Sequence, residues 1–244
     1  MPFQRERPVS PLDGWWVKDD FITNSGVATV TTGELDWIHT AIGTVDIPTF
    51  LTGDSGGNGV MRLTGAGAGA DGDGIAMHVN ADSNNFDAGT GGGFSFKFRY
   101  PTITGNQLAG NDFRIGIEDS VTATAPAVGL SVFSDAGVLS LRSDSTNGDQ
   151  SVAVSGVSTL TSGTTAIIDT WHTVEVVWSG ENGNGGPSVV NMKVDGENAA
   201  ALVSVIGSAE DGECKIVHYQ NTGGAATLEL DIDFVEFFMW RDVL

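Results

Sequence analysis

The stretch Phe94-Ser95-Phe96-Lys97-Phe98-Arg99-Tyr100 alternates between aromatic and polar side chains along its whole length. Successive side chains of a β-strand point to opposite faces of the sheet, so this pattern predicts an aromatic row on one face and a polar row on the other. Such alternation is typical of an antiparallel sheet that covers a core with one face and meets solvent with the other. The stretch therefore predicts a half-buried strand in a layered β protein.

Shorter runs of the same kind recur along the chain, separated by Gly, Asn, Asp and Ser, which favour turns. Residues 134–137 predict a hairpin turn, and no segment has apolar residues at helical spacing over three turns. The sequence therefore predicts an all-β fold of antiparallel sheets, a sandwich or a barrel. The expected strands cover residues 113–117, 128–133, 138–142, 171–178, 189–194, 216–220 and 228–240, with weaker signals for two short strands in 152–168.

Composition limits the class of protein and its partners. The 244 residues include 11 basic and 31 acidic side chains, which gives a net charge of −20. This charge repels nucleic-acid phosphates and anionic lipids, so neither nucleic acid nor a membrane is an expected partner. No apolar run approaches the ~20 residues of a membrane-spanning helix. Cys214 is the only cysteine, which excludes an internal disulfide and a cysteine metal cluster.

Residues 1–18 differ from the rest of the chain in charge and in proline content. They carry 3 basic and 2 acidic side chains, a net charge of +1, whereas the other 226 residues carry 8 and 29, a net charge of −21. Three of the 7 prolines lie here, and proline favours extended backbone. We therefore expect residues 1–14 to form an extended arm and residues 15–244 to form one domain; a floppy terminus is the alternative.

The arm and the two tryptophans that follow it carry the residues that we expect to bind a neighbouring subunit. Its basic side chains could meet the acidic surface of the next copy, and the aromatic side chains could act as apolar anchors. These residues are Phe3, Arg5, Arg7, Trp15 and Trp16. The first eight residues have no apolar segment behind their charges, so the sequence predicts no secretory signal and synthesis in a cytoplasm.

Several segments resemble the strands of laminin-G-like and concanavalin A-like jelly rolls. Residues 171–178 (WHTVEVVW) resemble the W-H-x-V strand of that family, and residues 190–196 (VNMKVDG) look like its partner strand. Residues 232–244 are similar to the closing strand, and residues 19–21 to the opening strand. The resemblance covers about residues 15–244. It implies two stacked antiparallel sheets, one of them curved, with a concave face that often binds glycans; lectin-like jelly rolls of this kind also occur in tailed-phage virion proteins.

Two physical expectations for the same segments do not depend on the resemblance. Asp195-Gly196 predicts a turn that needs positive φ. Large apolar side chains of the 171–178 strand are expected to fill the core. These side chains are Trp171, Val174, Val176 and Trp178.

The pentapeptide Gly53-Asp54-Ser55-Gly56-Gly57 matches the G-x-S-x-G pattern around a nucleophilic serine. A catalytic triad also needs a base and an orienting acid, and the hydrolase elbow needs a helix after the serine. Only His39 precedes Ser55, and no helix is expected behind it. The pattern is therefore interpreted as a glycine-rich turn.

Residues 229–236 (ELDIDFVE) resemble the E-x-D-x-x-E strand of β-glucanases, whose two carboxylates lie about 5–5.5 Å apart in retaining enzymes. On a strand, Glu229, Asp231 and Asp233 are expected on one outward face, and Glu236 on the other face unless a bulge intervenes. The side chains expected opposite the acids are Leu228, Leu230, Ile232 and Phe234. Since a phenylalanine stands at the position of the second glutamate, an acidic outer face is favoured over a catalytic site.

The glycine-rich stretch 65–74 and the Asn and Asp residues that follow it offer many hard oxygen atoms. Calcium needs 6–8 oxygen ligands, so a structural calcium ion is the candidate cofactor, and no other cofactor is expected. The candidate ligands are Asp71, Asp73 and Asp82. Because no complete calcium-loop pattern follows, simple turn formation is the alternative.

The histidines and the cysteine give little support for other chemistry. The four histidines, His39, His78, His172 and His218, do not have the spacing of a zinc site. His172 is expected to be buried and hydrogen-bonded. Cys214 stands among acidic residues, which raise the pKa of a thiol, so it is not expected to act as a nucleophile.

With no complete catalytic motif, we expect a protein without enzymatic activity. The leading hypothesis is a virion structural protein, either a phage capsid decoration or a tail- or fibre-associated surface protein, that attaches through contacts with other virion proteins and forms a homo-oligomer. A virion location fits a chain made in a host cytoplasm, without disulfides, and kept soluble by its negative charge. Many weak contacts on a lattice would sum to tight attachment. The alternatives are a lectin-like module that binds a host glycan and, third, a polysaccharide-cleaving enzyme.

Overall fold

The fold is described from a computed structural model, which covers residues 14–21, 31–32, 37–43, 49–51, 59–64, 72–79, 86–87, 91–101, 108–119, 126–145, 148–179, 189–204, 211–220 and 228–240. All regular elements in these ranges are β-strands. The same ranges hold no helix, and so none with the length and hydrophobicity needed to cross a membrane. The prediction of an all-β chain is confirmed.

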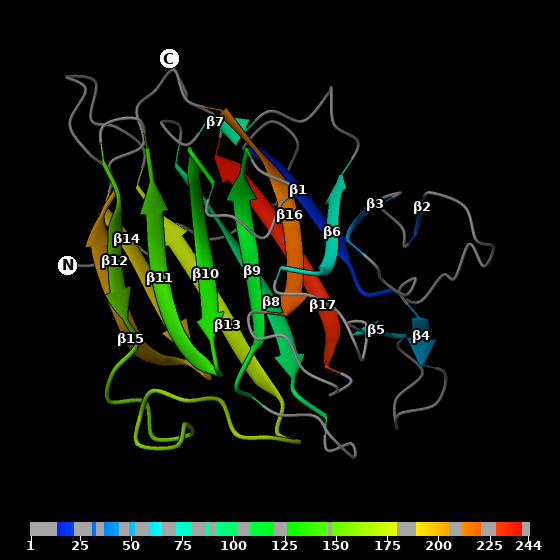
Figure 1. The fold of residues 1–244 in the computed structure, drawn as a ribbon. Helices are drawn as coiled ribbons and strands as arrows, with labels where there is room; N and C mark the ends of the chain where they lie inside the picture. Colours follow the sequence, from blue (N-terminus) through cyan, green and yellow to red (C-terminus); the bar gives the residue numbers. More distant parts are fainter. Residues whose placement is uncertain are drawn as a thin grey trace.

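The strands form two antiparallel sheets that stack on each other as a jelly-roll-like sandwich (Figure 1). In sheet A the order is β15-β14-β13-β8-β17-β5-β4, and β1 also pairs with β17. The bounds are β1 Gly14–Asp19, β4 Thr49–Leu51, β5 Val60–Thr64, β8 Gly92–Arg99, β13 His172–Trp178, β14 Val189–Val194, β15 Glu197–Val203 and β17 Glu229–Trp240.

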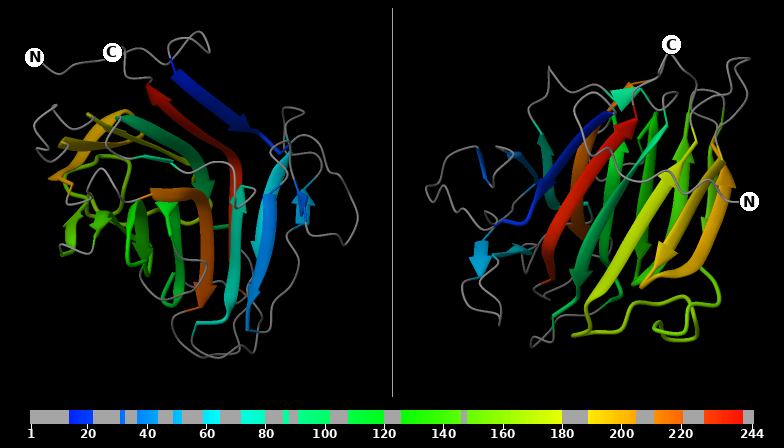
Figure 2. Two further views of the ribbon diagram at one scale, coloured as in Figure 1. Left: turned by 90° about the horizontal axis from the view of Figure 1, so that it is seen from above. Right: turned by 180° about the vertical axis from the view of Figure 1, so that it is seen from behind.

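In sheet B the order is β12-β11-β10-β9-β16-β6-β3-β2, and β7 also pairs with β16. The left view of Figure 2 shows the two layers edge-on, one above the other. The bounds are β2 Thr31–Thr32, β3 Trp37–Ile42, β6 Gly74–Val79, β7 Phe86–Asp87, β9 Asn111–Glu118, β10 Gly129–Asp135, β11 Val138–Asp144, β12 Gln150–Ala153 and β16 Asp211–Gln220.

The aromatic row of β8 lies at the centre of the core between the sheets. Phe94, Phe96, Phe98 and Tyr100 are all fully buried, as the alternation predicts. The ring of Phe98 meets that of Phe113 on β9 edge to face, with 4.9 Å between the ring centroids. Burial of each such side chain stabilises the fold by roughly 1.5–3 kcal/mol, so this row is a main source of contact between the two sheets.

Two hairpins turn at residues with positive φ. Ala136 and Gly137 join β10 to β11 with φ values of 49° and 80°, and Asp195 and Gly196 join β14 to β15 with φ values of 51° and 84°. Positive φ at both central residues gives a two-residue turn whose twist matches that of the flanking strands. Both predicted turns are therefore confirmed, and each fixes the register of its hairpin.

Three local predictions need correction. Trp171 is only half-buried and lies on the outer face of sheet A, because it precedes His172 and so has the parity of the outward residues of β13. Residues 152–168 contribute only the end of β12 and a series of turns rather than two strands. Gly14 is the first residue of β1 rather than the last of the arm. Residues 1–13 lie outside the described residues, so the arm stays a prediction.

Candidate functional site

The outer face of sheet A carries a row of acidic side chains along β17. The register between β17 and β8 shifts between Ile232 and Phe234, where a β-bulge adds one residue to β17. Because of this extra residue, the buried positions pass from Ile232 to Val235, and Phe234 turns outward. The acidic residues that share the outer face are Glu229, Asp231, Asp233 and Glu236; we call this set the β17 ladder.

The outward placement of Glu229, Asp231 and Asp233 confirms the sequence prediction. The placement of Glu236 on the opposite face, expected in the absence of a bulge, is wrong, because a bulge is present. The expectation that Phe234 faces the core is wrong for the same reason: the Lys18 ammonium of β1 lies 5.2 Å from the centroid of its ring.

Asp231 is the centre of the ladder and is fully buried beneath two guanidinium groups. Arg62 on β5 donates to both of its oxygens, from Nε at 2.6 Å and from the terminal nitrogen at 2.9 Å. Arg99 on β8 donates from Nε at 2.9 Å. Arg62 also bridges to Glu229 at 2.8 Å, and burial raises the pKa of Glu229, with Arg62 opposing the rise. Three strands are thereby tied together on this face.

Trp171 sits beside the ladder with two cations over its ring. The ammonium of Lys97 lies 5.0 Å, and the guanidinium carbon of Arg99 4.7 Å, from the centroid of the indole. The same Lys97 ammonium contacts Asp233 at 2.6 Å. These contacts hold a half-buried aromatic ring and a partly exposed ammonium together at the surface.

At the other end of the ladder, Trp16 of β1 is the most exposed aromatic side chain among the described residues, at 48%. Its indole N–H donates to Glu236 at 2.7 Å, and Ser95 of β8 donates to the other carboxylate oxygen at 3.4 Å. The hydrogen bond holds the indole against the sheet while a large part of the ring stays in solvent. Such an ordered, exposed indole is suited to binding, because little conformational entropy is lost when a partner covers it.

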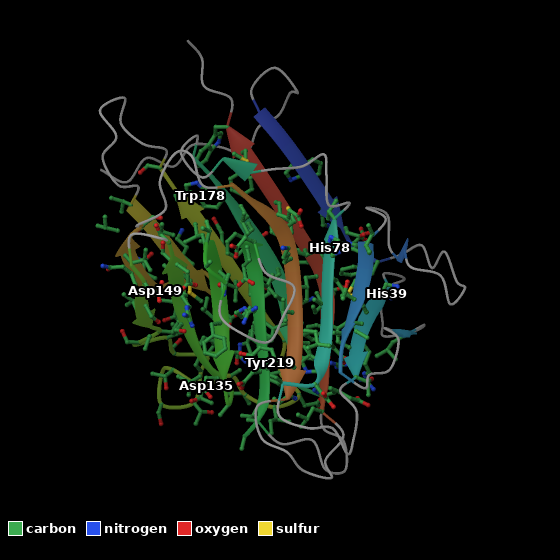
Figure 3. All side chains as sticks on the ribbon, turned by 45° about the horizontal axis from the view of Figure 1, so that its top comes forward. His39, His78, Asp135, Asp149, Trp178 and Tyr219 are labelled. Carbon is green, nitrogen blue, oxygen red and sulfur yellow. The ribbon has the colours of Figure 1, made fainter. Side chains whose placement is uncertain are left out.

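The outer face of sheet B also carries charges, and the central pair among them is shielded from solvent. Arg114 and Glu118 on β9 are both almost fully buried, and the Arg114 Nε lies 3.1 Å from each Glu118 oxygen. Burial raises the pKa of Glu118, and Arg114 opposes the rise. The Arg114 guanidinium carbon lies 5.7 Å from the ring centroid of Tyr219, which Figure 3 labels on the same face.

Two further ion pairs flank this central pair. Arg142 donates from Nε to Asp144 on β11 at 2.7 Å, and burial raises the pKa of Asp144. On β16, Lys215 lies 3.4 Å from Glu213, and the Glu213 carboxylate is also 3.8 Å from His78, the histidine on β6 that Figure 3 labels. Of the residues in these pairs, only His78 was a candidate from the sequence. The signal was present in the alternation of residues 111–118, which gives Arg114 and Glu118 a common face, but alternation does not reveal shielding.

The remaining candidate residues are not brought together. His172 is buried and hydrogen-bonded as predicted: its Nε2 accepts the Ile167 N–H at 3.1 Å, and its Nδ1 pairs with Asp195 at 2.9 Å. His218 is buried between the sheets, where burial lowers its pKa to about 3. Burial, with the nearby Glu213, raises the pKa of the Cys214 thiol, in the predicted direction.

The predicted calcium site and the arm fall largely outside the described residues. Asp71, Asp82, Phe3, Arg5 and Arg7 are not described, and Ser55 is not either. Asp73 is described and partly exposed next to Gly74, and Trp15 pairs through its backbone with Met239. Within the described ranges, no three His, Cys, Asp or Glu side chains converge in a way that could hold a metal ion.

The fold and this surface define the chain as a two-sheet antiparallel β-sandwich of jelly-roll type. No protein-family model and no curated protein sequence matches it. Among solved structures, a protein of unknown function from Shewanella oneidensis MR-1 is similar, with a TM-score of 0.61, 11% identity, and coverage of 95% of this chain and 89% of that one.

Two binding domains of larger proteins share the same fold. The botulinum neurotoxin serotype D binding domain has a TM-score of 0.57 at 15% identity, and the binding domain of Paraclostridial Mosquitocidal Protein 1 has 0.53 at 14%. They cover 93% and 88% of this chain, which spans only 48% and 47% of theirs. At these identities the likeness concerns the fold.

Proposed function

We propose that this chain is a non-enzymatic attachment module of a virion surface, a capsid decoration or a tail- or fibre-associated protein, and that it binds another virion protein through the outer face of sheet A. The observation that carries the proposal is the combination of the exposed Trp16 indole with the Trp171–Lys97 pair on one face. Aromatic and basic side chains are the usual anchors of protein interfaces, and the fold itself leaves function open.

The electrostatics of this face support binding to another acidic subunit. The chain carries a net charge of −20, yet three of the four acids of the β17 ladder are paired with Arg62, Lys97 and Arg99. A face whose acids are largely paired with cations lets two acidic proteins approach with less repulsion than elsewhere on their surfaces. The same reasoning supports assembly with further copies of this chain, a homo-oligomer.

The ladder is better suited to recognition than to hydrolysis. A retaining glycosidase needs a nucleophilic carboxylate that reaches its substrate and a second group that carries a proton. Asp231 is fully buried, and both of its oxygens accept from arginines. We therefore expect no turnover of β-glucans or alginates, and activity that is lost in Glu229→Gln would contradict the proposal.

The decisive test is mass spectrometry of purified virus particles from the source, which should detect the chain in stoichiometric amounts. A second test compares incorporation of the wild type with Trp16→Ala and Lys97→Glu. Both variants should incorporate at least tenfold less. Val138→Ala serves as the matched control, because Val138 is also exposed, at 38%, but belongs to β11 of sheet B. Absence of the chain from the particles would end the virion proposal.

A lectin-like function is the second candidate, and the exposed indole of Trp16 favours it, since an indole can stack on a sugar ring. It predicts binding on a glycan array that Trp16→Ala abolishes. An array without signal, together with incorporation into particles, would leave attachment through protein contacts as the function.

A further inference from the structure

Within the described residues, the backbone of β1 pairs with one neighbouring strand, β17. It pairs antiparallel with residues 235–240 of β17, with Gly14 opposite Trp240 and Asp19 opposite Val235. The first part of the same β17 edge, residues 229–232, pairs with β5. Among the described strands, β17 is the only one that pairs with β1. Figure 2 shows β1 lying against β17 on the side opposite β8.

The outward side chains of β1 make their contacts with the same partner strand. Trp16 donates to Glu236, and the Lys18 ammonium lies over the Phe234 ring. At the end of the segment, Asp19 accepts the Trp37 indole N–H at 3.0 Å and Phe21 is buried in the core. The described contacts of residues 14–21 with the body therefore include the edge of β17 and the Trp37 indole.

We propose that this strand is exchanged between copies: residues 14–21 of one chain bind to β17 and Trp37 of a second chain through the contacts seen within one chain. Exchange of an identical element preserves every contact, so it is a low-cost route to an oligomer. The second copy would then contribute Trp16 to the outer face of sheet A. The proposal concerns assembly of this chain with itself and holds or fails independently of a virion location.

Chain length permits exchange. The exchanged residues 14–21 carry one basic and two acidic side chains, so charge does not select between the strand's own body and a second copy. Nine residues, 22–30, separate the segment from β2, and an extended chain of this length reaches about 30 Å. A β17 edge without β1 would present unpaired N–H and C=O groups, so each copy that donates its strand must also receive one.

The test uses cysteines at Lys18 and Glu236, which lie directly opposite each other. Opposed residues of antiparallel strands have Cα atoms about 4.5–5.5 Å apart, within reach of a disulfide. Separately purified Lys18→Cys and Glu236→Cys proteins, differing in a mass tag, are mixed at high concentration, incubated and oxidised. A disulfide between the two chains can form readily only if the strand has exchanged. The native Cys214 is buried and should not compete.

The control pairs Lys18→Cys with Glu175→Cys, a cysteine at an exposed position of β13, to measure collisional cross-linking. Exchange predicts at least tenfold more mixed dimer with Glu236→Cys than with this control. The double variant Lys18→Cys/Glu236→Cys, oxidised at high dilution, should form a disulfide within one chain. This result would show that cysteines at the two positions can form a disulfide. Closure within the chain without mixed dimer above the control would overturn the proposal.

Discussion

The two outer faces of the sandwich carry ion pairs of the same chemistry in different surroundings. On sheet A, the arginines around Asp231 keep 16–19% of their side-chain surface in solvent. On sheet B, Arg114 and Glu118 keep about 1%. Partly exposed pairs contribute little to stability and remain available to a partner, whereas a buried pair is costly to break. The comparison teaches that the central ion pair of sheet B serves within the fold, whereas the arginines around Asp231 on sheet A keep contact with solvent.

The largest expected effect is the loss of Arg114. Arg114→Met leaves Glu118 without its cation in a buried site, which should lower the free energy of unfolding by about 3–5 kcal/mol. Urea unfolding at pH 7 measures the loss. It should shrink at pH 4.5, because the pKa of Glu118, already raised by burial, rises further without the arginine, and the neutral acid is tolerated.

The double variant Arg114→Met/Glu118→Leu is the matched control. It removes both charges, so most of the lost stability should return. If the single variant unfolds with a loss below about 1 kcal/mol, the pair behaves like the surface pairs of sheet A, and the distinction between the two faces is wrong.

The second largest effect comes from His218 in the interior. In acid, its titration changes the free energy of unfolding together with the carboxylates of both faces, so the contributions must be measured apart. His218 has its pKa lowered to about 3 by burial, and its Nε2 lies 2.7 Å from Asn111 Oδ1. An unfolded histidine takes up a proton below about pH 6.5, so the unfolded state binds more protons and stability falls as the pH falls toward 3. Between pH 7 and pH 4 this histidine should lower the free energy of unfolding by about 3 kcal/mol.

The variant His218→Gln keeps a donor for Asn111 and removes this titration. On acidification from pH 7 to pH 4, the free energy of unfolding of this variant should fall by about 3 kcal/mol less than that of the wild type. Guanidinium unfolding at several pH values gives both curves. Parallel curves would show that His218 does not dominate the acid response, which would then come from the carboxylates of the two faces.

Arg62→Met tests the sheet A side of the comparison and should have a smaller effect. Asp231 keeps its hydrogen bond from Arg99, and Arg62 is partly in solvent, so the expected loss is about 1–2 kcal/mol. The loss should also fall in high salt, which screens exposed charges more than buried ones. A loss as large as that of Arg114→Met, independent of salt, would make the two faces equivalent.

The sequence predicts the layers well because alternation is a local property. The aromatic side chains of the 94–100 stretch face the core as their spacing requires, and Asp195-Gly196 turns where positive φ is needed. The bulge next to Asp233 depends on the neighbouring β8, since an extra residue is defined only against a partner strand. For the same reason the sequence could not decide the side of Glu236, nor show that the polar face of residues 111–118 is shielded.

Trp16→Ala should have the smallest effect on stability. The indole is about half exposed, and its hydrogen bond to Glu236 lies at the surface, so the expected loss is below about 1 kcal/mol. Thermal unfolding of the isolated protein measures it. Because the fold is retained, any loss of attachment in this variant reports on the face itself. A loss above about 2 kcal/mol would instead show that Trp16 holds β1 in place, and the residue would then belong to the fold, as Arg114 does on sheet B.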